Sequence, residues 1–335
     1  MNYNITDLGA SFLPTDINNL GRIAGSFNAN GGSATIWDNG VYQNIGTGWT
    51  TGINSTSIVV GNSGPHATLW QGSTSLDLGT LGGSNSYATA INNSGQIAGS
   101  SITPVTGGFQ YIHATTWENG VIKDLGTLGG NKSAATGIND IGQIVGYSTI
   151  NNNTFPTTHA FIYSNGTMQD LTPGTGGSSA THINNNGLVT GYVSLDNGSI
   201  NIATVWTNGQ STSIGTLGGS NSYAFGLNDL GQVVGYSETS QGGLTHGYVW
   251  QDGTLTDLNS YVTGSDWELW NAIAINDSGS IIGRGLLNGV DHGFLLTVAE
   301  PVPEPSTLFL LGAGFGAFAL LQTRKNRPGK RRYIT

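Results

Sequence analysis

Short apolar runs alternate with polar turns rich in glycine and asparagine along most of the chain. The repeating unit is clearest in residues 85–130, where the turn of residues 92–95 ends in Gly95 and a later turn reads Asn119-Gly120. The first turn suits a type I turn followed by a left-handed residue, and Asn-Gly is preferred in two-residue β-hairpins. The unit therefore predicts four short antiparallel strands.

Two anchors of this unit recur along the chain. An Ile-Asn or Leu-Asn pair closes the first strand of each copy at intervals of 36 to 48 residues, beginning at Ile17, Ile53, Ile91, Ile138, Ile183, Leu227 and Ile275. In the third strand a small residue stands three positions before an aromatic one, as Ala34/Trp37, Ala67/Trp70, Ala114/Trp117, Ala160/Tyr163, Ala203/Trp206 and Gly247/Trp250, with Gly293/Leu296 as a weaker seventh copy. This period fits a propeller blade, whereas a β-helix rung needs about half that length. We predict an all-β, seven-bladed β-propeller of four-stranded blades over residues 1–299.

The seventh copy stops before its fourth strand, and the chain begins with a segment of that type. Residues 5–9 match residues 122–126, the fourth strand of the clearest copy. The first strand of the chain is therefore expected to complete the last blade. A closed ring leaves only short outer strands as free edges, which limits edge-to-edge aggregation.

Composition agrees with this fold and excludes several functions. Charged residues make up 9% of the chain, and 54 of 335 residues are glycine, so helical bundles are excluded. No cysteine is present, which excludes disulfides and thiolate sites. Residues 1–323 hold all 19 Asp and Glu but only four of the ten Lys and Arg, and such a negative body disfavours nucleic-acid binding.

Repeated polar residues are expected to be structural. The recurring histidines are His66, His113, His159, His246 and His292, and the recurring aspartates are Asp7, Asp77, Asp124, Asp170 and Asp257. A catalytic centre needs one constellation, whereas a side chain present once per blade fastens strands and turns by hydrogen bonds. The alternatives are a histidine ring that binds a metal and a glycosidase-type carboxylate pair. The Trp and Tyr residues of the third strands are likewise expected in the core between blades rather than as a sugar-stacking platform. We predict no metal and no cofactor.

Residues outside the repeat are better candidates for a specific function. They include His182, Glu238 and the apparent insertion of residues 259–270. Within that insertion Asp266, Trp267, Glu268 and Trp270 are possible ligand contacts, because aromatic rings flanked by carboxylates can stack on a glycan and hydrogen-bond it. The other interpretation is a loop that fastens the ring closure.

The C-terminus has a three-part pattern. Residues 300–306 form a linker with Pro303, Glu304 and Pro305, and residues 306–323 carry no charge, which at 1.5 Å per residue gives about 27 Å, enough to span a bilayer's hydrocarbon core. We predict a single transmembrane helix over residues 307–323 and a basic tail over residues 324–335. The tail holds Arg324, Lys325, Arg327, Lys330, Arg331 and Arg332, which by the positive-inside rule stay in the cytoplasm.

This pattern resembles the PEP-CTERM sorting signal of exopolysaccharide-producing Gram-negative bacteria, which an exosortase is thought to recognise and cleave. Pro303, Glu304 and Pro305 match the motif that names it. The body resembles the extracellular HAF-repeat family, on the basis of His159-Ala160-Phe161 and of residues 124–130 and 138–146. Such proteins are expected to carry a secretory leader, whereas Met1 to Asp7 show none, so either the start codon is placed too late or the sequence is truncated.

The resemblance implies an exported protein, held at the inner membrane with its body outside the cytoplasm and then displayed at the cell surface or in the matrix after processing. We expect a non-catalytic binding or structural component whose partners are an exosortase-type enzyme, the membrane, and exopolysaccharide or matrix proteins. The alternative is a propeller glycosidase or polysaccharide lyase that uses a unique carboxylate set in the central channel.

Overall fold

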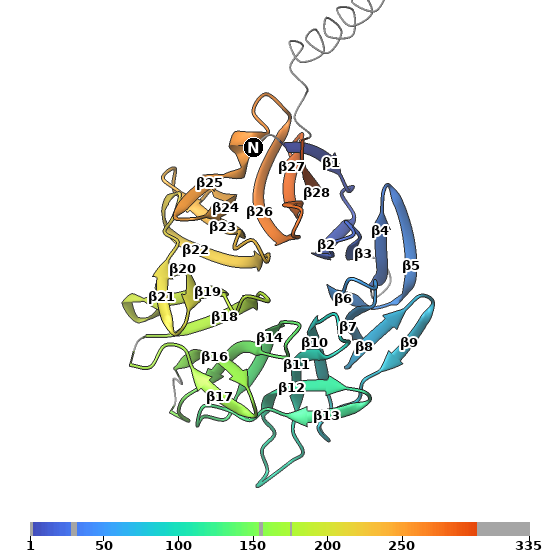
Figure 1. The fold of residues 1–335 in the computed structure, drawn as a ribbon, viewed down its shortest axis with the longest axis vertical. Coiled ribbons are helices and arrows are strands. Elements are labelled where there is room, and N and C mark those ends of the chain that lie inside the picture. Colours follow the sequence, from blue (N-terminus) through green and yellow to red (C-terminus); the bar gives the residue numbers. More distant parts are fainter. Residues whose placement is uncertain (1–2, 28–31, 154–156, 175, 300–335) are drawn as a thin grey trace, which may run out of the picture. The chain divides into compact units, whose positions relative to one another are not determined.

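The computed structural model describes residues 3–27, 32–153, 157–174 and 176–299. Within these residues seven four-stranded antiparallel sheets stand around a central opening (Figure 1). The sheets are the blades of a propeller, so the predicted all-β, seven-bladed fold with four strands per blade is confirmed. We number the blades along the chain from blade one to blade seven.

Blades one to four each run from an inner strand to an outer strand. Their strands are β2 (Phe12–Ile17), β3 (Ile23–Phe27), β4 (Ser33–Asp38) and β5 (Val41–Thr47) in blade one; β6 (Trp49–Ile53), β7 (Val59–Ser63), β8 (His66–Gln71) and β9 (Thr74–Asp77) in blade two; β10 (Ser86–Ile91), β11 (Ile97–Ile102), β12 (Ile112–Glu118) and β13 (Val121–Asp124) in blade three; β14 (Ser133–Ile138), β15 (Ile144–Thr149), β16 (Thr158–Ser164) and β17 (Thr167–Asp170) in blade four.

Blades five and six repeat this order, and blade seven takes its outer strand from the start of the chain. Their strands are β18 (Ser178–Ile183), β19 (Val189–Leu195), β20 (Ile200–Thr207) and β21 (Gln210–Ser213) in blade five; β22 (Gly218–Leu227), β23 (Val233–Thr239), β24 (Thr245–Gln251) and β25 (Thr254–Asp257) in blade six; β26 (Trp267–Ile275), β27 (Ile281–Leu287), β28 (Val290–Val298) and β1 (Tyr3–Asp7) in blade seven. Two short 3-10 turns, η1 (Asp196–Gly198) and η2 (Leu258–Tyr261), lie in connections, and no helix in the described ranges is long and apolar enough to cross a membrane.

The ring is closed by the pairing of β1 with β28. Ile5 lies opposite Leu296 and Asp7 opposite Phe294 in this antiparallel pair. Leu8 follows β1, is fully buried, and donates its backbone N–H to the Gly293 carbonyl at 2.9 Å. Residues at the two ends of the propeller sequence therefore share one sheet.

The core lies between neighbouring blades. Val60 and Ala67 of blade two pack with Ala88, Ile97 and Trp117 of blade three, and equivalent clusters recur around the ring. The aromatic column of the third strands is mostly buried, with Trp70, Trp117 and Trp206 at 1–2% exposure. The prediction that this column is core is confirmed.

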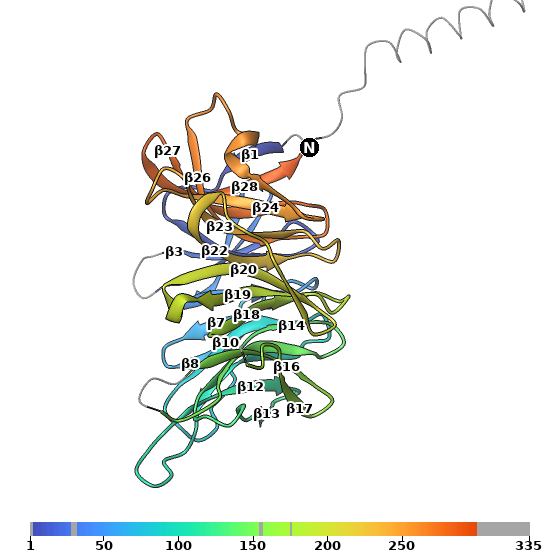
Figure 2. The same ribbon diagram turned by 90° about the vertical axis from the view of Figure 1, so that its left-hand side faces the viewer.

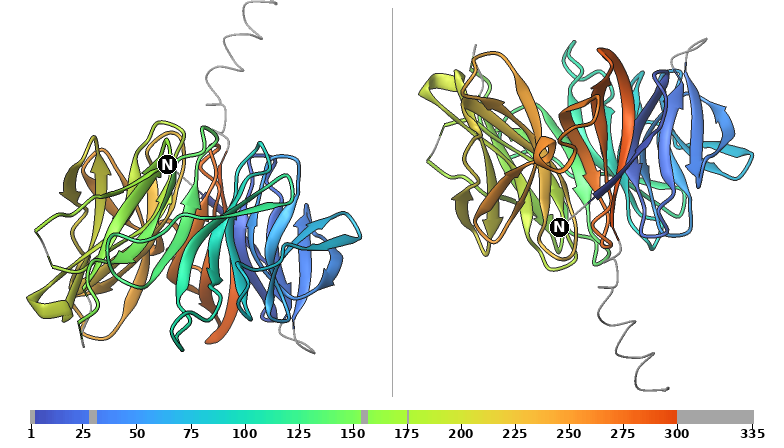
Figure 3. Two further views of the ribbon diagram at one scale, coloured as in Figure 1. Left: turned by 90° about the horizontal axis from the view of Figure 1, so that it is seen from below. Right: turned by 90° about the horizontal axis from the view of Figure 1, so that it is seen from above.

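Turn geometry explains the recurring glycines and asparagines. Asn39 and Gly40 both have positive φ, 47° and 89°, as a two-residue type I′ hairpin requires. Gly95 has a φ of 85°, as predicted from the turn sequence. Seen edge on, the strands cross the thickness of the ring (Figures 2 and 3), so the turns after the first and third strands lie on one face and the other connections on the opposite face.

Each second strand also carries a glycine that lets the first strand approach closely. A Cβ at Gly235 would lie 1.9 Å from the Tyr223 carbonyl oxygen of β22, and the contact is to rigid backbone. We expect Gly235→Ala to lower the free energy of unfolding by about 2–3 kcal/mol, because the two strands must separate locally. Gly177→Ala is the control, since a Cβ there would meet Ser194 at an ordinary 3.5 Å. Equal denaturation midpoints for the two variants would contradict this expectation.

Candidate functional site

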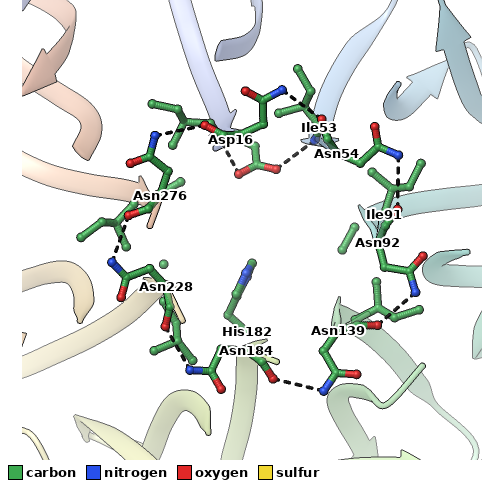
Figure 4. A pocket seen from close by; sticks show the side chains of 18 of the residues that line it. Asp16, Ile53, Asn54, Ile91, Asn92, Asn139, His182, Asn184, Asn228 and Asn276 are labelled. Atoms are coloured by element: carbon green, nitrogen blue, oxygen red, sulfur yellow. Dashed lines mark hydrogen bonds between the residues drawn. The ribbon is translucent and has the colours of Figure 1, made fainter. Parts of the chain in front are cut away.

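The central channel is the candidate site. The seven inner strands enclose a cavity of about 380 Å³, lined by the ends of these strands and the turns that follow them (Figure 4). This volume falls within the range of small-molecule pockets.

A ring of seven asparagines encircles the channel. Each amide Nδ2 donates to the backbone carbonyl of the equivalent asparagine in the next blade at 3.0–3.3 Å, and Asn276 closes the circle onto Asn18. Each Oδ1 accepts the N–H of the residue four positions later, which holds its own turn. Figure 4 shows the bonds between blades as a closed circle, formed by Asn18, Asn54, Asn92, Asn139, Asn184, Asn228 and Asn276. The Ile-Asn repeat of the sequence is therefore a device that locks blades together.

This ring gives a stability prediction. Asn139 donates to Asn184 O at 3.1 Å and accepts from Gln143 N at 2.9 Å. Asn139→Ala therefore removes the partner of the part-buried Gln143 N–H and leaves the buried Asn184 carbonyl with the Gly187 N–H alone. We expect a loss of about 1–3 kcal/mol in the free energy of unfolding. Asn153→Ala, in an exposed loop, is the control and should change it by less than about 0.5 kcal/mol. A variant of Asn139 as stable as the control would show that the ring contributes nothing.

The channel wall is uneven at one position. The residue before each Ile-Asn or Leu-Asn pair is glycine or alanine in five blades, namely Gly52, Ala90, Gly137, Gly226 and Ala274. In blades one and five it is Asp16 and His182, whose side chains point into the opening from opposite sides (Figure 4). At this position blades one and five therefore place ionisable side chains where the other five blades have none.

Asp16 is held by the backbone of two blades. Its carboxylate oxygens accept the N–H groups of Ile17 at 2.8 Å and of Ile53 at 2.9 Å. Burial raises the pKa of Asp16 to about 7, although these two N–H groups lower it. The carboxyl group is thus fixed in place and changes its charge near neutral pH.

His182 has no such support. Among the residues that the structure describes, none forms a hydrogen bond with its imidazole, and the side chain is partly buried in the channel. Burial lowers the pKa of His182, and the nearby Asp229 carboxylate opposes this shift. At neutral pH the ring is therefore uncharged and carries one nitrogen lone pair and one N–H.

A second, more exposed series of hydrogen bonds runs along one mouth of the channel. The N–H of Asp140 donates to Asn185 Oδ1, that of Asn185 to Asp229 Oδ1, and that of Asp229 to Asp277 Oδ1, at 2.8–2.9 Å. Three carboxylates therefore line this mouth, each with hydrogen-bond donors. Among the described residues no group of three possible ligands is arranged to hold a metal ion.

The five recurring histidines and aspartates pair with each other. In every case the His Nδ1 lies 2.6–2.8 Å from a carboxylate oxygen of the Asp in the outer strand, as His66–Asp77, His113–Asp124, His159–Asp170, His246–Asp257 and His292–Asp7. The same Asp accepts the backbone N–H two residues later, as in Asp77 with Gly79 at 2.8 Å. Hydrogen bonds from His66 and Gly79 lower the pKa of Asp77. The prediction that both residues fasten strands and turns is confirmed.

The predicted ligand contacts near the ring closure do not form one cluster. Trp267, Glu268 and Trp270 belong to the inner strand β26, and exposed Asp266 precedes it, so this segment is not wholly a loop insertion. Trp267 packs edge-on against Phe294 at 6.3 Å between centroids, while Trp270 lies 5.8 Å from the Arg284 guanidinium. Glu268 is exposed. Their role as ligand contacts stays a prediction.

Glu238, the other residue outside the repeat, is engaged with blade six. Its carboxylate accepts Asn221 Nδ2 at 2.9 Å and the backbone N–H groups of Ser220 and Asn221 at 3.1 Å. The Asn221 amide, followed by these N–H groups, lowers the pKa of Glu238. Glu238 thus holds the entry into β22.

Comparisons with known proteins locate the sorting signal. The PEP-CTERM protein-sorting motif matches residues 301–325. This chain therefore carries a PEP-CTERM motif, a signal for exosortase-type processing of exported proteins. Pro303, Glu304, Pro305, Arg324 and Lys325 fall within the match, and Arg327, Lys330, Arg331 and Arg332 follow it. All of them, together with the predicted transmembrane helix, lie outside the described residues.

Two solved structures align with this chain at low sequence identity. No curated protein matches this chain. TolB from Acinetobacter baumannii aligns at 11% identity and a TM-score of 0.45, covering 83% of this chain and 64% of TolB. A Trypanosoma rangeli sialidase, solved as a covalent intermediate with 2,3-difluorosialic acid, aligns at 9% identity and a TM-score of 0.38, covering 87% of this chain and 54% of the sialidase.

Proposed function

We propose that this chain is an exported propeller that acts as a non-catalytic binding or structural component of the extracellular matrix. The observation that carries the proposal is the PEP-CTERM motif placed directly after a ring that ends at Val298. The five His–Asp pairs support a non-catalytic role, because each fastens the third strand of a blade to the outer strand of the same blade and none lines the channel. His159-Ala160-Phe161, which starts its third strand with one of these pairs, supports assigning the blades to the HAF-repeat type.

The proposed organisation has four parts. Residues 1–299 form the propeller, residues 300–306 the linker with the sorting motif, residues 307–323 a transmembrane helix and residues 324–335 a cytoplasmic basic tail. In this arrangement the helix and the tail hold the protein at the inner membrane until an exosortase-type enzyme separates them from the body. The freed propeller then reaches the cell surface or matrix, where exopolysaccharide or matrix proteins are its proposed partners.

A second candidate function is a glycan-active hydrolase or lyase. The observation that favours it is Asp16, a channel carboxyl whose pKa is raised to about 7 by burial and is thus suited to proton transfer at neutral pH. Incubation with exopolysaccharide fragments distinguishes the two functions. We expect binding without new products, whereas turnover that Asp16→Ala abolishes would favour the enzyme.

The export proposal is tested by replacing Pro303, Glu304 and Pro305 together with alanine in a host that has the processing enzyme. We expect the wild-type body at the cell surface or in the medium, and the variant in the membrane fraction with its tail attached. Pro301→Ala, in the same linker but outside the three-residue motif, is the control and should behave as wild type. The same distribution for wild type and the triple variant would contradict the proposal.

A further inference from the structure

The central channel combines a suitable volume with two side chains that break the sevenfold repeat. Five blades place only glycine or alanine at the wall position, so the propeller closes without a polar side chain there. Asp16 and His182 face each other across the cavity of about 380 Å³ (Figure 4). Ring closure alone therefore does not account for these two residues.

His182 is available for a ligand. Its imidazole is shielded by the channel wall, and no group in the described part of the chain forms a hydrogen bond with it. Because burial lowers the pKa of His182, the ring offers a lone pair to a donor at neutral pH. A protonated His182 would repel a cation. The neutral imidazole does not, and its lone pair accepts a hydrogen bond from a ligand that donates one.

The charge of the channel determines which ligand fits. The residues that line it include the carboxyl groups of Asp16, Asp140, Asp229 and Asp277 and no lysine or arginine. Carboxylates around a confined opening attract cations and repel anions. The lining also includes the aromatic side chain of Phe225. This residue follows Ala224, whose carbonyl accepts the Thr181 hydroxyl between blades five and six. Aromatic faces also favour organic cations.

We propose that the channel binds a small organic cation that carries a primary ammonium group, with the ammonium held between the Asp16 carboxyl and the His182 imidazole. An ammonium donates up to three hydrogen bonds, and these two groups supply a negative charge and a lone pair. A polyamine and an amino sugar share this chemistry, and both are small enough for the cavity. The inference rests on the proposed binding function and names its ligand class.

The test is isothermal titration calorimetry of the full-length chain with four probes. They are spermidine, a glucosamine disaccharide with free amines, its N-acetylated counterpart and Mg²⁺ alone. We expect at least one of the two amines to bind at least tenfold more tightly than both the N-acetylated sugar and Mg²⁺, and the tighter amine identifies the source. Two variants assign the site: His182→Gly copies the residue of Gly137 and Gly226, and Asp16→Ala copies that of Ala90 and Ala274.

Each variant should weaken binding of the amine at least tenfold. The control is Glu118→Gln, which removes one exposed carboxylate outside the channel and should leave binding unchanged. His182→Asn, which keeps a polar side chain, replaces His182→Gly if the glycine variant fails to fold by circular dichroism. Failure of both amines to bind, equal binding of the acetylated sugar or of Mg²⁺, or binding unaffected by both channel variants would overturn the proposal. None of these outcomes changes the distribution of the sorting-motif variant, so failure here is distinct from failure of the export proposal.

Discussion

A chain that lacks residues 1–9 is expected to lose the cooperative thermal transition of the propeller or to unfold at least 10 °C lower. The deletion removes β1, so the backbone groups of β28 that pair with Ile5 and Asp7 lose their partners. It also removes the fully buried Leu8 and the His292–Asp7 pair at 2.8 Å. These losses together exceed about 4 kcal/mol, since one buried leucine alone contributes roughly 2–3 kcal/mol. An exposed apolar strand edge also favours aggregation.

Calorimetry of the deletion variant is best paired with a rescue. A synthetic peptide with the sequence of residues 1–9, added in excess, should restore part of the transition because it can occupy the open edge of β28. A peptide with Ile5 and Leu8 replaced by serine is the control and should not. An unchanged melting temperature after the deletion would show that the ring does not depend on this closure.

The second large effect is a pH dependence of stability that comes from Asp16. Its pKa is about 7 in the folded chain because of burial, against about 3.9 in the unfolded chain. The folded state therefore keeps this proton to higher pH than the unfolded state does. The stability from this group is complete below about pH 4 and is lost as the pH rises through about 7, and the loss amounts to up to about 4 kcal/mol.

Chemical denaturation of wild type and Asp16→Ala between pH 4 and pH 8 isolates this contribution. The variant should gain stability relative to wild type by up to about 4 kcal/mol across this interval, because it has no carboxyl to ionise in the channel wall. Asp266→Ala, which removes an exposed carboxyl, should keep a constant difference from wild type. A constant difference for Asp16→Ala as well would mean that Asp16 is not shielded from water.

Local sequence signals were sufficient to predict the architecture. Two turns per unit, with glycine at the positions of Gly95 and Gly40, define four strands. The six Ile-Asn pairs and the one Leu-Asn pair give the number of blades. The likeness of residues 5–9 to a fourth strand pointed to the last blade, where β1 lies beside β28. These signals work because turn conformation and strand alternation depend on neighbouring residues.

The channel was harder to predict because its contacts join residues far apart in the sequence. The asparagine ring links positions 36 to 48 residues apart, and Asn276 to Asn18 spans 258. His182 was singled out as lying outside the repeat, but Asp16 was not. A signal for both was available: aligned at the residue before each Ile-Asn or Leu-Asn pair, the seven copies read Asp, Gly, Ala, Gly, His, Gly, Ala.

The structure of residues 259–270 could not be predicted from that segment alone. Its aromatic and acidic residues suggested an inserted loop, whereas Trp267, Glu268 and Trp270 extend the inner strand β26. A register shift between Leu269 and Asn271 places Trp270 in a bulge opposite β27. Bulges depend on the partner strand, which lies further along the chain, so a reading of the segment alone does not reveal them.

Export with removal of the tail is tested most directly by the intact mass of the protein recovered from the cell surface or the medium. A mass that includes the propeller through Val298 and ends before Arg324 is expected, because processing near Pro305 removes the basic cluster. A surface protein that retains residues 324–335 would contradict processing. Recovery of the chain only from the cytoplasm would contradict export.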